Sequence, residues 1–241
     1  MKAIILAAGY ATRLYPLTKN TPKALLDIKG TTILDHILEK VEKINEINEI
    51  VIVSNNKFYS NFLNWKKTYK GKCLVTILND NTNSNEDRLG AIGDINFAIE
   101  TKKINEDIII LASDNYFSFE LTNLYEYYKE KNSDCITGTY ADEELLAQKR
   151  FAVAKIDNTD QVIDLEEKPD NPKSNIIAYA IYIYKKETLP LFKEYLNEGN
   201  SKDAPGNFPS WLHKKKPIYC YKFTGSCIDI GTVEAYNNIN K

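Results

Sequence analysis

Apolar and polar positions along this chain predict strands and helices in alternation. A short apolar strand is predicted over 2–6. An amphipathic helix is predicted over 32–44, because its apolar residues recur every three or four positions. Further strands are predicted over 50–54, 74–78, 107–112 and 218–222, and further helices over 89–100 and 233–239. Because strands that alternate with helices form sheets wrapped by crossovers, we expect a three-layer α/β/α fold with a mostly parallel, mixed central sheet.

The loop after the first strand has the features of a phosphate-binding site. Ala7, Ala8 and Gly9 let backbone N–H groups approach an anion closely, and Arg13 and Lys23 add positive charge. The loop lacks the second glycine and the Lys-Ser/Thr of a Walker loop, and the chain contains no G-x-G-x-x-G. The pattern therefore indicates a phosphate-handling site of another class.

Composition narrows the classes of partner and compartment. The 241 residues carry a net charge of −2, which argues against a nucleic-acid or membrane-surface partner because both reward a basic excess. The four cysteines form no C-x-x-C pair, so we expect a reduced, cytoplasmic protein. No apolar run approaches the ~18 residues of a membrane span. The length suits one domain, 1–241.

Two aspartates stand where a cation could bind. Asp114 follows the strand over 107–112 and so lies at the same sheet edge as the Gly9 loop. Asp229 lies in a D-I-G-T turn; each aspartate alone could equally be a turn or cap residue. The only histidines, His36 and His213, are far apart in the sequence, so we expect no histidine-based zinc site and a structural role for His36.

Residues 6–28, LAAGYATRLYPLTKNTPKALLDI, resemble the signature of the nucleotidylyltransferases that activate sugar 1-phosphates. Two later motifs, E-E-K-P at 166–169 and then D-I-G-T at 229–232, follow in the order of that family. The resemblance implies a Rossmann-like nucleotidyltransferase fold and transfer of a nucleoside monophosphate from an NTP to a sugar 1-phosphate, with release of pyrophosphate. It also implies Mg²⁺ as the cofactor.

The resemblance assigns roles to particular residues. Arg13 would contact the β- and γ-phosphates, Lys23 the α-phosphate region, and Lys168 the acceptor phosphate. Asp114 and Asp229 would hold Mg²⁺, which prefers one or two carboxylates plus phosphate oxygens. The implied nucleotide-binding residues are Leu6, Ala7, Ala8, Gly9, Thr12, Asn85 and Gly90. The implied acceptor-binding residues are Asn115, Ala152, Glu167, Lys168 and Tyr182. The two groups suggest a nucleotide-binding part, 1–115, and an acceptor-binding part, 116–241.

The base is left open by the sequence. Asn85 stands where pyrimidine-using relatives have a glutamine, and its shorter amide can serve a donor-rich or an acceptor-rich edge. A pyrimidine is favoured, with dTTP and UTP ahead of CTP and GTP. Arg88 and Asp94 add charges beside this segment, and they fit a solvated loop and helix face as well as a role in specificity.

The acceptor is also open, because two alanines depart from the family pattern. Ala152 and Ala180 replace glycines that let a pyranose approach the backbone, so each adds a methyl group beside the expected sugar pocket. One alternative is a cytidylyltransferase that acts on phosphocholine or another alcohol phosphate. A second is a catalytically silent nucleotide-binding regulatory module, and a third a nucleotide-dependent structural protein that assembles through residues 207–216. Homo-oligomer formation stays open.

Overall fold

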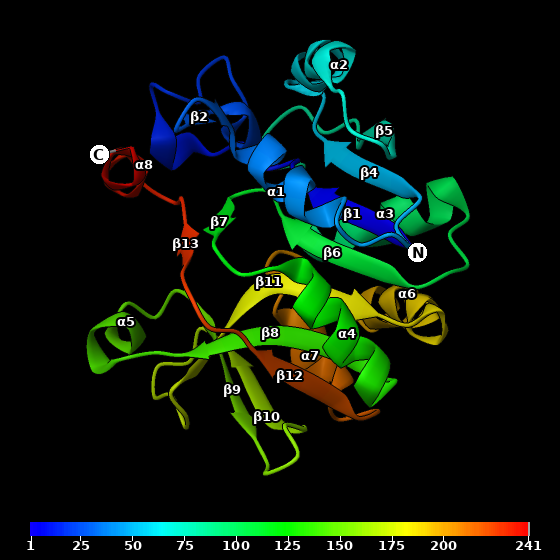
Figure 1. The fold of residues 1–241 in the computed structure, drawn as a ribbon, viewed down its shortest axis with the longest axis vertical. Coiled ribbons are helices and arrows are strands. Elements are labelled where there is room, and N and C mark those ends of the chain that lie inside the picture. The colour runs from blue at the N-terminus through cyan, green and yellow to red at the C-terminus, as the bar shows by residue number, and fades with distance from the viewer. Residues whose placement is uncertain (241) are drawn as a thin grey trace.

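A mixed nine-stranded sheet forms the centre of the computed structural model, which describes residues 1–240 (Figure 1). Its main path runs β10 (Val162–Glu167), β9 (Ala152–Ile156), β11 (Ile176–Tyr184), β6 (Ile108–Ala112), β1 (Lys2–Leu6), β4 (Glu49–Ser54) and β5 (Leu74–Asn79). β8 (Asp134–Tyr140) joins this path through β11 and also pairs with β12 (Ile218–Lys222). The four strands from β6 to β5 are parallel, whereas β11 runs antiparallel to β6 and to its other neighbours.

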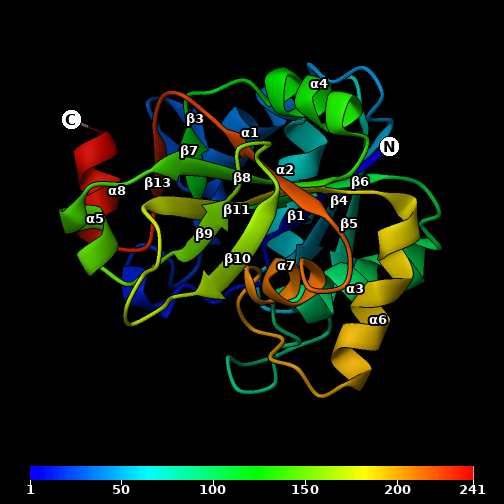
Figure 2. The same ribbon diagram turned by 90° about the horizontal axis from the view of Figure 1, so that it is seen from below.

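Helices cover both faces of the sheet (Figure 2). One layer contains α1 (Ile33–Val41), α2 (Tyr59–Thr68) and α4 (Leu121–Lys131), and the other α3 (Ala91–Lys102), α6 (Leu189–Asn197) and α7 (Asn207–Leu212). The strands between them are almost continuously apolar because both of their faces are buried. The expected three-layer α/β/α fold is confirmed, and its parallel strands are concentrated in the first half of the chain.

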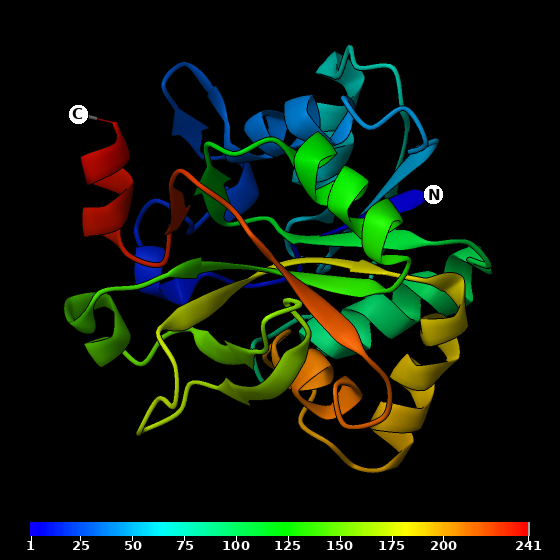
Figure 3. The same ribbon diagram turned by 60° about the horizontal axis from the view of Figure 1, so that its bottom comes forward.

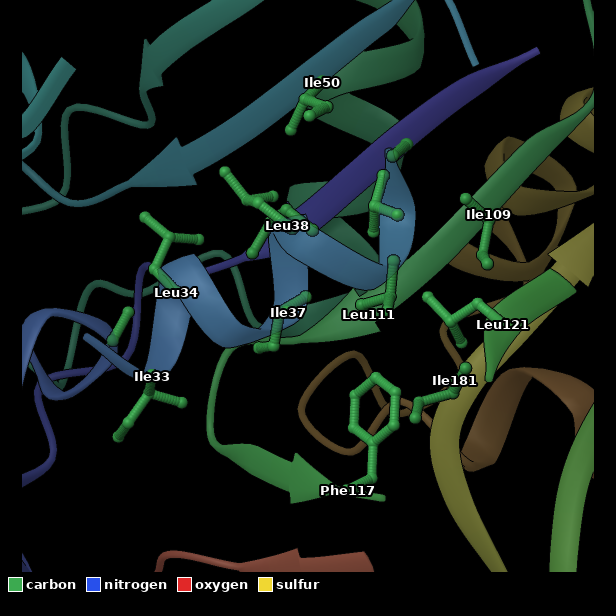
Figure 4. Close-up of a cluster of buried hydrophobic side chains, with 14 of the residues drawn as sticks. Ile33, Leu34, Ile37, Leu38, Ile50, Ile109, Leu111, Phe117, Leu121 and Ile181 are labelled. Atoms are coloured by element: carbon green, nitrogen blue, oxygen red, sulfur yellow. The ribbon is translucent and has the colours of Figure 1, made fainter. Parts of the chain in front are cut away.

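The packing of α1 illustrates how the apolar pattern sets this arrangement (Figure 4). Ile33, Leu34, Ile37 and Leu38 are buried in a core cluster that also contains Ile50, Ile109 and Leu111 of the parallel strands. The helix begins at Ile33 because the Thr32 hydroxyl accepts a hydrogen bond from the Asp35 N–H at 3.1 Å. On the opposite layer the core is aromatic, with the rings of Phe192 and Phe208 stacked at 3.8 Å.

Short elements complete the carboxyl edge of the parallel strands. β7 (Asn115–Phe117) pairs with β13 (Cys227–Asp229), and β2 (Asp27–Ile28) pairs with β3 (Thr31–Thr32). The final helix, α8 (Val233–Ile239), lies beside the first part of the chain, where the Tyr236 hydroxyl donates to the Asp27 carbonyl at 2.7 Å (Figure 3). A short helix, α5 (Glu143–Ala147), and 3-10 turns at Thr12–Leu14, Lys23–Leu25 and Lys186–Thr188 complete the secondary structure of residues 1–240.

Several element boundaries differ from the expected ones. The helix predicted over 89–100 begins at Ala91, because Gly90 has φ +81°, a left-handed conformation outside the helical region. The helix predicted over 32–44 ends at Val41. Among the described residues, no helix is long and apolar enough to cross a membrane.

Candidate active site

A cavity of about 450 Å³ lies beyond the ends of β1 and β6, between the parallel and the antiparallel strands. It gathers most of the residues that the sequence singled out, although they come from all parts of the chain. Those lining it are Leu6, Ala8, Gly9, Thr12, Arg13, Asn85, Gly90, Asp114, Asn115, Ala152, Glu167, Lys168, Tyr182 and Asp229. Ala7 and Lys23 do not line it: Ala7 is buried in the core, and Lys23 reaches the site through Asp114.

The first loop is held open by hydrogen bonds to its backbone. The Asn55 side-chain amide donates to the Ala8 carbonyl at 2.8 Å, and the Ala7 N–H donates to the Val53 carbonyl at 2.9 Å. The Thr18 hydroxyl holds the Ala11 carbonyl at 2.7 Å. A methyl group built on Gly9 meets nothing within 4 Å, so the backbone there borders open space. A ligand can therefore approach this peptide closely, as the small side chains predict.

Two carboxylates and one ammonium meet at the junction of the two halves. The Lys23 Nζ lies 2.8 Å from Asp114 Oδ2 and 3.9 Å from Asp229 Oδ1. The pairing of β7 with β13 brings the aspartates together, since the Ile230 N–H donates to the Asp114 carbonyl at 2.9 Å. Burial, and then the charge of Asp114, raise the pKa of the Asp229 carboxyl. The pair is thus a concentrated negative site that a cation stabilises.

Arg150 is a site residue that sequence reasoning missed. Its Nη2 lies 2.8 Å from Asp229 Oδ2, and a methyl group built on Gly231 would meet the same nitrogen at 2.5 Å. The glycine of the D-I-G-T turn thus leaves room for the guanidinium. A lone arginine before Phe151 carries no motif, so only the fold reveals it.

Glu167 and Lys168 lie together on the antiparallel side of the cavity. Glu167 ends β10, and burial raises its pKa. A methyl group on Gly206 would collide with the Glu167 carboxylate where it now lies, so the Glu167 side chain would have to shift to accommodate it. Lys168 is exposed, with its Nζ 3.5 Å from Glu167 Oε1. The arrangement offers a largely enclosed hydrogen-bond acceptor beside an exposed cation.

The two departures from the family pattern both face this part of the cavity. Ala152 is 4% exposed, and Ala180 is half-buried on β11. Tyr182, also on β11, is buried nearby. The added methyl groups therefore border the cavity, as the sequence predicts.

Charged residues also surround the opposite end of the cavity. Asn85 is exposed, and Arg88 forms an ion pair with Asp203, with Nη2 3.1 Å from Oδ2. Gly90 packs against the Lys202 carbonyl, which a methyl group would approach to 2.6 Å. Asp94, one turn into α3, is buried and lines the cavity.

Neither histidine belongs to the cavity. His36 Nε2 lies 2.9 Å from the Ile28 carbonyl, and its ring packs edge-on against Tyr116. The structural role expected for His36 is therefore confirmed. Within residues 1–240 no three His, Cys, Asp or Glu side chains form a metal-ligand cluster.

An α/β sheet whose open first loop and acidic pair meet at the carboxyl edge of its parallel strands is typical of proteins that handle nucleotides. The profile of the nucleotidyl transferase family matches residues 2–241, and the chain belongs to this family.

Curated relatives agree with this membership. The bifunctional protein GlmU of Methanocaldococcus jannaschii is 30% identical over 96% of this chain and 51% of its own length. Glucose-1-phosphate adenylyltransferase of Clostridium novyi is 30% identical over 98% of this chain and 64% of its own length. The chain thus spans about half to two thirds of the length of these relatives.

Solved structures agree on the fold. The structure of a UDP-glucose pyrophosphorylase in complex with UDP-glucose superposes with a TM-score of 0.83 at 20% identity, covering 99% of this chain and 96% of that one. The Rossmann-like fold expected from the sequence is confirmed.

Proposed function

We propose that this protein transfers a nucleoside monophosphate from an NTP to a sugar 1-phosphate, giving an NDP-sugar and pyrophosphate. The observation that carries the proposal is the junction of Lys23, Asp114 and Asp229, whose two carboxylates line a cavity that also borders the first loop and Glu167. The names of the curated relatives include a transferase that acts on glucose 1-phosphate, which supports this class of acceptor.

The nucleotide occupies the side formed by the first half of the chain, residues 1–115. The backbone of Leu6 to Gly9 and Thr12 border the nucleotide, and Arg13 at the rim binds the β- and γ-phosphates. Lys23, which already pairs with Asp114, binds the α-phosphate region. Asn85 and Gly90 border the base, and the Asn85 amide can serve a donor-rich or an acceptor-rich base edge.

The acceptor occupies the side formed by Asn115 and by residues 116–241. Of these, Lys241 lies outside the described residues. The Glu167 carboxylate accepts hydrogen bonds from sugar hydroxyls, and Lys168 binds the acceptor phosphate. Ala152 and Tyr182 shape the pocket between them. Arg150 lies between the acidic pair and this pocket, and we propose that it turns from Asp229 to the acceptor phosphate.

The reaction needs no protein nucleophile. An oxygen of the acceptor phosphate attacks the α-phosphorus in line, a new P–O bond forms, and the bond to the pyrophosphate oxygen breaks. The protein must bring two anions together, so its cations and its geometry carry the catalysis. Lys23 and Arg13 bind the NTP and Lys168 the acceptor, which offsets their mutual repulsion.

Asp114 and Asp229 fit a Mg²⁺ ion. The test is the chemistry of the pair: two neighbouring carboxylates, one with a raised pKa, are stabilised by a divalent cation, and Mg²⁺ prefers few protein ligands plus phosphate oxygens. When bound, Mg²⁺ neutralises charge on the α-phosphate and on the departing pyrophosphate.

Pyrophosphate release tests the proposal. UTP, dTTP, CTP, GTP and ATP are each combined with glucose 1-phosphate, mannose 1-phosphate, N-acetylglucosamine 1-phosphate and phosphocholine in the presence of Mg²⁺. Acceptor-dependent release with a sugar 1-phosphate is the expected result. Release only with phosphocholine would overturn the sugar assignment. Nucleotide binding without release from any pair would favour a silent regulatory module.

A further inference from the structure

A pair of buried carboxyl groups lies between β5 and α3. Asp80 directly follows β5 and is 7% exposed, and Asp94, in the first turns of α3, is 6% exposed. Asp80 Oδ1 accepts from the Thr82 N–H and hydroxyl, both at 2.8 Å. The other oxygen, Asp80 Oδ2, and Asp94 Oδ1 are enclosed without a donor from residues 1–240. Both oxygens are enclosed and the two carboxyl groups perturb each other, so a proton on Asp94 Oδ1 would give Asp80 Oδ2 the donor that it lacks.

Surrounding charges do not remove the need for this proton. Burial, followed by the charge of Asp80, raises the pKa of Asp94 to about 8, and Lys202 opposes this only weakly. Burial also raises the pKa of Asp80, and Asp87 adds to it. On the rim, Arg88 is paired with Asp203, and from the first loop the Tyr10 hydroxyl lies 3.4 Å from Thr82 Oγ1. These surrounding charges therefore leave the pKa of Asp94 raised, which favours its protonated carboxyl.

The pair borders the cavity at the end assigned to the nucleoside. Asp94 lines the cavity together with Leu6, Ala8, Asn85 and Gly90. Since Oδ1 is enclosed, Oδ2 is the carboxyl oxygen that Asp94 can present to a ligand in the cavity. A structural carboxyl could stabilise the start of α3 from an exposed position at much lower cost, whereas burial of two acids needs a further reason.

We propose that Asp94 selects the base of the nucleotide, with Oδ2 accepting an N–H from an exocyclic amino group while Oδ1 shares its proton with Asp80. This inference rests on the proposed nucleotidylyl transfer. Cytosine, adenine and guanine each present an amino group at the base-pairing edge. Uracil and thymine present one N–H between two carbonyl oxygens, and these carbonyl oxygens repel a carboxyl oxygen. A base with an amino group is therefore preferred, and among pyrimidines that base is cytosine.

The test compares Asp94→Ala with Asp94→Asn by titration calorimetry of each NTP with Mg²⁺, without acceptor. The asparagine amide can donate to Asp80 Oδ2 and leave its carbonyl oxygen toward the cavity, so it reproduces the protonated aspartate. We expect the wild type to bind its best amino-bearing nucleotide, CTP, ATP or GTP, at least tenfold more tightly than UTP or dTTP. Asp94→Ala loses this ratio, and Asp94→Asn restores it.

Glu126→Ala, which removes an exposed carboxylate on α4, serves as the control and keeps the wild-type ratio. The inference is overturned if the wild type binds UTP or dTTP as tightly as any amino-bearing NTP, or if Asp94→Ala keeps the preference. The wild-type ratio decides the point even if the alanine variant does not fold. Absence of binding by all five nucleotides would overturn the proposed function as well, so the two failures are distinguishable.

Discussion

The buried pair of Asp80 and Asp94 should make the stability of the protein depend on pH, and replacing Asp94 by asparagine should remove the part of that dependence due to Asp94. The pKa of Asp94 is raised from 3.8 to about 8, so the folded state favours the protonated carboxyl. A group of this kind contributes stability that is fully present below pH 3.8 and is lost as the pH rises through about 8. Asparagine does not titrate and keeps a donor toward Asp80.

The magnitude follows from this pKa. For each pH unit between the unfolded and the folded pKa of Asp94, the free energy of unfolding falls by about 1.4 kcal/mol. Between pH 5 and pH 8.5 the wild type should therefore lose roughly 4 kcal/mol of unfolding free energy through Asp94, and the Asp94→Asn variant should not. Such a loss is large beside a total stability of about 5–15 kcal/mol.

Urea unfolding followed by circular dichroism at both pH values measures this difference directly. Asp87→Asn is the matched control in the neighbouring loop. Hydrogen bonds from the Asn83 and Ser84 N–H groups lower the Asp87 pKa, so its carboxyl is ionised at both pH values. Its variant should differ from the wild type by the same amount at each pH. If Asp94→Asn also shows a constant difference, within about 1 kcal/mol, then Asp94 does not hold a proton in the folded protein.

Four further results are expected. Asp114→Asn and Asp229→Asn should each lower the rate of pyrophosphate release by at least about a hundredfold with an unchanged melting curve, and wild-type rates in both would remove the acidic pair from the reaction. Glu167→Gln should raise the KM for the acceptor by about tenfold while calorimetry finds the nucleotide Kd unchanged, because the carboxylate lies on the acceptor side; an equal change in both constants would contradict this placement. Gly90→Ala should weaken nucleotide binding in the same titration and lower the melting temperature, since φ is +81° and the new methyl group would lie 2.6 Å from the Lys202 carbonyl oxygen; wild-type values for both would contradict this. Phe208→Ala should lower the free energy of urea unfolding by about 3–5 kcal/mol through loss of its stack on Phe192, and a loss under 1 kcal/mol would show that this layer repacks freely.

The sequence was most informative where one local pattern sets the structure. The strand over 2–6, the strand over 218–222 and the helix over 233–239 have the predicted bounds, because their apolar periodicity agrees with their packing. Helix ends were less predictable, since they depend on tertiary contacts. For example, α3 begins at Ala91 rather than at residue 89, because Gly90 has a positive φ and lies close to the Lys202 carbonyl.

The apolar pattern did not predict how the strands of the antiparallel half pair. β8, β9 and β11 carry long apolar or mixed runs whose pairing is set by partners distant in the sequence. Membership of the site followed the same rule. Arg13 and Lys168 stand in motifs and could be predicted, whereas Arg150 enters only because β13 brings Asp229 to it. Asp94 was visible as an extra charge, but its burial was not.

The charges around Asp114 and Asp229 bear on how the protein would bind its anionic substrates. Lys23 and Arg150 each form an ion pair with one member of the acidic pair, Asp114 and Asp229, so two cations offset two carboxylates. Asp114 and Asp229 would hold a divalent cation there, which would supply two positive charges. Lys23 and Arg150 would then turn to phosphate oxygens that arrive at the same place. The site would thus exchange internal ion pairs for substrate contacts at little desolvation cost, because its carboxylates and cations are already partly buried.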